Sequence, residues 1–215
     1  MIFGWVSMGS ASGLRSFDPV RVADLEYRMW VAYYLRRWTN LMAASVRLLR
    51  LGFGTDPARI LRGAWLVLRA VQLWAPFPDN DPDGAQARLH KLYALVGSRF
   101  GTPADPARAA RLEINWWRAH RKRQHAPDPA ETGDELLDSV TRLYSYLFGQ
   151  TEDAVRPAAV HRVRAMDLSD QWVRTGCVPD SPLLRLERAA LVRAYAALLA
   201  AIHETGAGEL ASAAD

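Results

Sequence analysis

The segment Leu112-Glu113-Ile114-Asn115-Trp116-Trp117-Arg118-Ala119-His120 combines an acid, an imidazole and two adjacent tryptophans. Its apolar residues recur at helical spacing, which predicts an α-helix. Seven residues of such a helix turn through about 700°, only about 20° short of two full turns. Glu113 and His120 therefore lie on one line of the helix, with Trp117 between them. Titratable groups in an apolar stripe are costly to bury unless they are paired or bound to a metal ion.

A second segment repeats this pattern. Residues 25–33 and 112–120 share the form L-E-x-x-[MW]-W-x-A-[YH]. The same helical geometry places Glu26, Trp30 and Tyr33 on one line. The sequence thus predicts two separate helices that each direct an acid and a polar ring toward the interior.

The rest of the chain also has helical periodicity, and no segment shows the alternating pattern of a strand. We therefore predict an all-α fold, a single-domain irregular bundle of about six or seven helices. Residues 1–16 are expected to form a flexible leader, 17–204 the helical domain and 205–215 a flexible tail. Helix starts are predicted at three Asp-Pro pairs, where the carboxylate accepts free amide hydrogens and proline has none to satisfy. These pairs are Asp18-Pro19, Asp56-Pro57 and Asp105-Pro106.

Two features of this prediction concern connections. The apolar pattern of the first helix runs from Val20 to about Leu51, with a bend expected at Thr39-Asn40. The proline-rich stretch 76–84 is an irregular loop before a helix that starts near Ala85. Its aspartates match half of an EF-hand calcium loop, but the bidentate glutamate of such a loop is absent, which favours helix capping over calcium binding.

Composition restricts the class of protein. The 215 residues are 50% hydrophobic, enough for one full core. The formal charge is +4 and the pI about 9.5, but all basic residues except Lys91 and Lys122 are arginine. We interpret this excess as a coding bias of a GC-rich, bacterial genome, and we predict no nucleic-acid partner. A homo-oligomer is compatible with the sequence.

The cysteine count and the hydrophobic runs bear on location. The single cysteine, Cys177, rules out an internal disulfide or a multi-cysteine metal cage within one chain. Arginines interrupt the longest apolar runs before they reach the roughly 20 residues of a membrane span. We therefore expect a soluble, cytoplasmic protein without a transmembrane helix.

The inward acids suggest a metal centre. Glu187 lies on the apolar side of the last helix, and Asp167 beside valines of the preceding one. This layout resembles ferritin-like di-metal carboxylate bundles, in which helices each supply an acid or an imidazole. The resemblance implies iron or manganese as cofactor, held by Glu26, Glu113, His120, Asp167 and Glu187. The chain contains no Glu-x-x-His pair, which the standard di-iron site requires.

Two functions follow from these patterns. The first is a metal-dependent oxidoreductase or oxygenase of the di-iron or manganese carboxylate type, acting on a small apolar substrate, with Tyr33 as a redox-active catalytic neighbour. The alternative is a non-catalytic helical module that binds an apolar ligand or a protein partner. In that case the inward acids are paired to arginines, for which Arg37, Arg118 and Arg164 are candidates. The eight tryptophans fit either a ligand pocket or a tryptophan-rich core.

Overall fold

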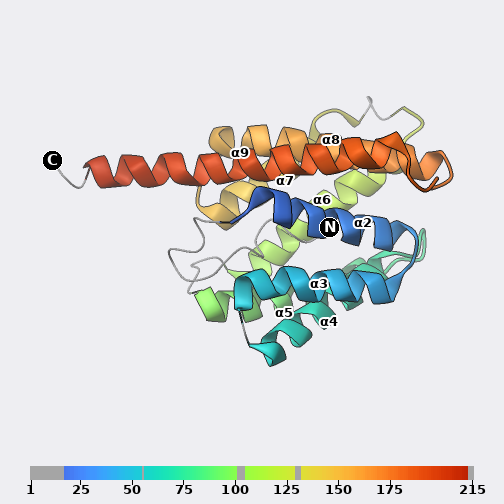
Figure 1. Ribbon diagram of the computed structural model, residues 1–215, viewed down its shortest axis with the longest axis horizontal. Coiled ribbons are helices and arrows are strands. Elements are labelled where there is room, and N and C mark those ends of the chain that lie inside the picture. The colour runs from blue at the N-terminus through green and yellow to red at the C-terminus, as the bar shows by residue number, and fades with distance from the viewer. Residues whose placement is uncertain (1–16, 55, 101–104, 129–131, 213–215) are drawn as a thin grey trace.

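The computed structural model describes residues 17–54, 56–100, 105–128 and 132–212. That part of the chain forms eight α-helices and no strand (Figure 1). The helices are α2 (Pro19–Tyr34), α3 (Trp38–Phe53), α4 (Pro57–Trp74), α5 (Pro82–Phe100), α6 (Pro106–His125), α7 (Glu135–Phe148), α8 (Glu152–Arg174) and α9 (Pro182–Ser212). The predicted all-α bundle is therefore confirmed.

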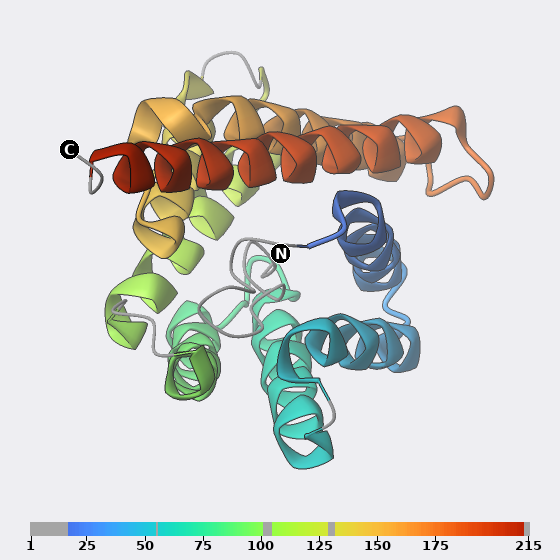
Figure 2. The ribbon, with the colours of Figure 1, turned by 60° about the vertical axis from the view of Figure 1, so that its left-hand side comes forward.

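The helices form a closed circuit. Each one packs on the next along the chain, and α9 packs back on α2. Figures 1 and 2 show α8 and α9 side by side along one edge, with α3, α4 and α5 on the opposite side. The circuit surrounds one continuous core, so side chains from non-consecutive helices meet in the middle of the bundle.

The three predicted Asp-Pro helix starts are confirmed. Asp18 accepts the amides of Val20 and Arg21, at 2.9 and 3.2 Å, and so caps α2. Asp56 caps α4 and Asp105 caps α6 in the same way. These bonds satisfy amides that have no acceptor within the helix, which is why the sequence alone locates the three starts.

The first predicted helix is two helices. The chain leaves the helical path at Leu35 to Arg37, before the expected bend at Thr39-Asn40. Arg36 has a φ of 55° in the left-handed region, and its guanidinium donates to the carbonyl of Ala75 at 2.8 Å. This long-range bond supports a sharp turn that no glycine or proline marks, and it explains why the sequence predicts one helix too few.

The connection before α5 is built around a capping aspartate. The amide of Gly84 donates to Asp81 Oδ1 at 2.8 Å. A Cβ on Gly84 would lie 2.1 Å from the other oxygen of the same carboxylate, so a side chain there would disturb the cap. The helix begins at Pro82, three residues earlier than the predicted start at Ala85.

The predicted boundaries of the domain are only partly covered by the structure. The leader, 1–16, lies outside the described residues. At the other end, α9 continues past the predicted tail boundary at 205 as far as Ser212. Within the described part of the chain, no helix is both long and apolar enough to cross a membrane.

Asp105 provides a test of the capping account, because it starts the helix that carries the segment 112–120. Its carboxylate accepts the amides of Ala107 and Arg108 at 2.9 and 3.2 Å. We expect Asp105→Ala to lower the free energy of unfolding by about 1 kcal/mol, measured by urea denaturation. Asp105→Ser restores a capping oxygen and should recover most of the loss; equal losses in both variants would contradict the capping role.

Candidate functional site

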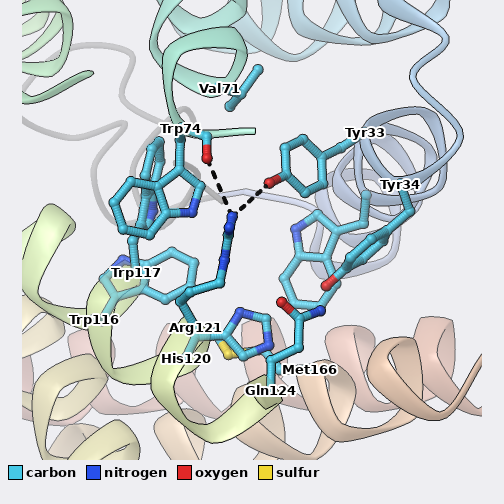
Figure 3. A pocket seen from close by; sticks show the side chains of 11 residues that line it. Tyr33, Tyr34, Val71, Trp74, Trp116, Trp117, His120, Arg121, Gln124 and Met166 are labelled. Atoms are coloured by element: carbon cyan, nitrogen blue, oxygen red, sulfur yellow. Dashed lines mark hydrogen bonds between the residues drawn. The ribbon is translucent and has the colours of Figure 1, made fainter. Parts of the chain in front are cut away.

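An aromatic pocket lies at the centre of the helix circuit (Figure 3). Its walls come from four non-consecutive helices, α2, α4, α6 and α8. The lining residues are Trp30, Tyr33, Tyr34, Val71, Trp74, Trp116, Trp117, His120, Arg121, Gln124 and Met166. Six of these eleven side chains are tryptophans or tyrosines. The other polar side chains, His120, Arg121 and Gln124, all come from α6.

The repeated segments provide two walls of this pocket. Trp30 and Tyr33 come from the copy at 25–33, and Trp117 and His120 from the copy at 112–120. The rings that the sequence places on one line of each helix therefore face the same pocket. The two glutamates of the repeat, in contrast, lie outside the pocket lining, in the core.

A buried carboxylate, Asp170 of α8, holds the polar side of the pocket together. Its Oδ1 accepts the hydroxyl of Tyr34 at 3.2 Å and the amide of Gln124 at 2.9 Å. Its Oδ2 lies 3.1 Å from Nε2 of His120. The acid therefore links α2, α6 and α8, and it fixes three polar side chains on or beside the pocket.

Arg121 is the cation of the pocket. One of its terminal nitrogens donates to the hydroxyl of Tyr33 and to the carbonyl of Trp74, both at 3.3 Å (Figure 3). The centre of its guanidinium lies 5.1 Å from the ring centroids of Trp74 and Phe77. Both hydrogen-bond acceptors are neutral, and no carboxylate among the described residues forms an ion pair with this arginine.

Behind the pocket, Glu26 is fully buried in an ion pair with Arg162. The two terminal nitrogens of the arginine reach the two carboxylate oxygens, at 2.5 and 3.1 Å. The hydroxyl of Tyr195 also donates to Glu26, at 2.5 Å, and Arg162 donates to the hydroxyl of Tyr144 at 3.1 Å. Burial raises the pKa of Tyr144 to about 12, so this phenol stays neutral at physiological pH.

Glu113 lies in a second buried cluster. It accepts the hydroxyl of Tyr93 at 2.9 Å and the indole N–H of Trp117 at 3.0 Å. Burial raises the pKa of this carboxyl group. Because Trp117 also lines the pocket, Glu113 orients one of the pocket walls from behind.

The carboxyl group of Glu187 is fully buried. Neither of its carboxylate oxygens has a hydrogen-bond partner within the described part of the chain, and the same is true of the Ser169 hydroxyl. Burial raises the pKa of Glu187 to about 8; the neighbouring Ser169 hydroxyl opposes this rise, and the charges of Glu26 and Asp170 add to it. At neutral pH this side chain is therefore mostly a neutral carboxylic acid.

The predicted site residues thus fall into several places. Only Tyr33 and His120 line the pocket, while Glu26, Glu113 and Glu187 are buried elsewhere in the core as their stripes indicate. Asp167 is partly exposed and pairs with Arg123 at 3.0 Å. Across the residues that the structure describes, no three His, Cys, Asp or Glu side chains are grouped so that they could hold a metal ion.

The predicted arginine partners need correction. Arg37, Arg118 and Arg164 are exposed, and the buried partner of Glu26 is Arg162 instead. The sequence carried a signal for it, since Arg162 lies in helical register with the buried Ala158 and Met166.

Asp170 is a second residue that sequence reasoning missed. It lies one turn after Met166 on the buried side of α8, where Asp167 faces outward toward Arg123. Each acid lies one helical turn after an apolar residue, Asp167 after Val163 and Asp170 after Met166, so only the rotation of α8 against α6 distinguishes them. That rotation is a tertiary property.

The Glu26–Arg162 pair generates a stability prediction. Arg162→Met leaves a buried carboxylate without its cation, and we expect the free energy of unfolding to fall by about 3–5 kcal/mol. The double variant Arg162→Met/Glu26→Gln removes the uncompensated charge and should regain a large part of this loss in urea denaturation. If the double variant is as unstable as the single one, buried charge is not the cause.

Glu187 generates a pH prediction. The unfolded carboxyl titrates near 4.5 and the folded one near 8, so the folded state binds more protons between these values. Stability contributed by this group therefore falls as the pH rises from about 4.5 to about 8, and is constant above. The side chain of the Glu187→Gln variant cannot ionise. Its free energy of unfolding should therefore rise relative to that of the wild type by on the order of 1 kcal/mol per pH unit in that window. A pH-independent difference in urea denaturation would refute the shift.

Comparison with other proteins gives no relative from which a role could be transferred. The chain matches no protein-family model, no curated protein and no solved structure. What the pocket binds is therefore argued from its own side chains.

Proposed function

We propose that this protein binds a small molecule with a flat apolar body and a carboxylate group in the aromatic pocket. This takes the second of the two functions that the sequence leaves open, a helical module that binds an apolar ligand. The supporting observation is the half-buried cation Arg121, which lies among aromatic rings without an acidic partner in the described part of the chain.

The free donors of Arg121 support the choice of an anion. A guanidinium has five N–H donors, and the two bonds of Arg121 both leave from the same terminal nitrogen. The other terminal nitrogen and Nε form no hydrogen bond with the described residues. When the bonded terminal nitrogen gives up Tyr33 and Trp74, the guanidinium can donate two parallel bonds to a carboxylate, which makes the pair strong and directional.

The walls support an apolar, flat body. The rings of Trp74 and Trp117 lie 5.4 Å apart by their centroids, and Trp116 and His120 line the same space. Trp30 adds a buried indole N–H that has no acceptor among the described residues. Pockets of this type use aromatic surface for affinity and a few polar groups for orientation.

Ligand entry requires movement of Arg121. The free cavity is only about 40 Å³, the size of a few water molecules. The guanidinium itself occupies the space between Trp74, Phe77 and Tyr33. Its two bonds to neutral acceptors are long, so little is lost when the side chain turns outward to meet a carboxylate.

The contacts of the acids give less support to a metal-dependent oxidoreductase. Glu26 and Glu113 accept hydrogen bonds from protein groups on both carboxylate oxygens, so a metal ion would have to replace these bonds. Iron or manganese binding remains a prediction from the sequence, and elemental analysis of the purified protein checks it.

Matched pairs of probes test the proposed ligand class. Indole-3-acetate and benzoate carry the carboxylate, and indole-3-acetamide and benzamide have nearly the same shape without the charge. We expect the acids to bind more tightly than the amides in isothermal titration calorimetry. Arg121→Met should weaken the binding of the acids by about 10- to 100-fold, the effect of losing a hydrogen-bonded charge pair. The binding of the amides should be unchanged.

Arg118→Met is the matched control, because Arg118 lies on the exposed side of the same helix. It should bind all four probes as the wild type does. The proposal fails if none of the acids binds, if acids and amides bind equally, or if the Arg121 and Arg118 variants behave alike.

A further inference from the structure

A groove on the surface between α2 and α3 is lined on its rim by three arginines. Arg28 comes from α2, and Arg37 and Arg47 from the start and the third turn of α3. Figure 1 shows these two helices side by side, joined at one end. The groove is separate from the aromatic pocket, with which it shares no lining residue.

The positive charge of this rim is not balanced locally. Arg37 and Arg47 are exposed and pair with no acid in the described part of the chain, and only Arg28 is bonded, to Asp24 at 2.9 Å. No acid is among the residues that line the groove. The surrounding sequence, 27–74, contains eight arginines and a single acid, Asp56. Arginines thus outnumber acids by eight to one in this segment, whereas the whole chain has 25 arginines and 23 acids.

The other residues that line the groove form its floor, and most of them are apolar with short side chains. They are Tyr27, Val31, Ala32, Ala43 and Ala44, with Asn40 as the one uncharged polar side chain. Small side chains on the floor leave room for apolar side chains of another segment. A single-stranded nucleic acid would stack its bases on aromatic side chains in such a position, and this floor offers one aromatic ring.

We propose that the α2–α3 groove binds an acidic, amphipathic helix of a partner protein. The apolar stripe of that helix packs on the alanine-rich floor, and its carboxylates pair with the arginines of the rim. Arg37 and Arg47 are ten residues apart along the chain, which is about 15 Å at 1.5 Å per residue. The partner helix therefore needs about three turns, with acidic side chains at both ends of its apolar stripe.

Three designed peptides test this proposal with the full-length protein. Each is a labelled 15-residue helix with one Leu/Ala stripe, flanked by glutamates, by glutamines or by lysines. We expect the glutamate peptide alone to bind in fluorescence anisotropy, and its affinity to fall as salt is added. Arg37→Glu/Arg47→Glu should weaken it at least about tenfold and should create binding of the lysine peptide.

Arg164→Glu/Arg185→Glu is the matched control, because these exposed arginines lie on α8 and α9 and change the net charge equally. It should leave the glutamate peptide bound. The groove variant should also bind indole-3-acetate as the wild type does, which separates this site from the pocket. The proposal is overturned if the glutamate peptide does not bind, if it binds no better than the glutamine peptide, if both arginine pairs act equally, or if a thymidine oligonucleotide competes more strongly.

Discussion

The buried pair of Glu26 and Arg162 is the constraint on which the bundle depends. Two full charges inside an apolar core are tolerated only with close geometry and with hydrogen bonds on their remaining sites. The pair meets this condition because Tyr144 and Tyr195 complete its bonding. Four helices, α2, α7, α8 and α9, must therefore keep one mutual register. Apolar packing alone tolerates small slides between helices, whereas this network does not.

The same pair also positions the pocket. The guanidinium of Arg162 lies 5.6 Å from the ring centroids of both Trp30 and Trp116, which are pocket walls. Glu113 orients Trp117, and Asp170 orients the polar rim. Three of the four tryptophans that line the pocket, Trp30, Trp116 and Trp117, are thus supported from behind by a buried acid or base. Glu113, and Glu26 through Arg162, support aromatic rings of the pocket, and these two acids lie in separate buried clusters.

The fold was largely predictable, because its signals are local. The Asp-Pro helix starts and the helical periodicity depend on residues within one turn, and both are confirmed. The break at Arg36 was not predictable, since it depends on a bond to Ala75, which is 39 residues away.

Burial of the site residues could be predicted, but their partners could not. Glu26 and Glu113 are buried as their apolar stripes indicate. Which arginine pairs with Glu26, and that Asp170 rather than Asp167 reaches the pocket, depend on how α8 is rotated against its neighbours. An apolar stripe shows which face of a helix is buried, but it does not show which residue of a neighbouring helix that face contacts.

The concentration of indole rings in the pocket has a spectroscopic consequence. Four of the eight tryptophans line it, Trp30, Trp74, Trp116 and Trp117, and two of them lie near the cation of Arg162. Their emission is sensitive to nearby charge and to water. Half of the tryptophans of the protein therefore report on this one region, so the molecule contains its own optical reporter of whatever enters the pocket.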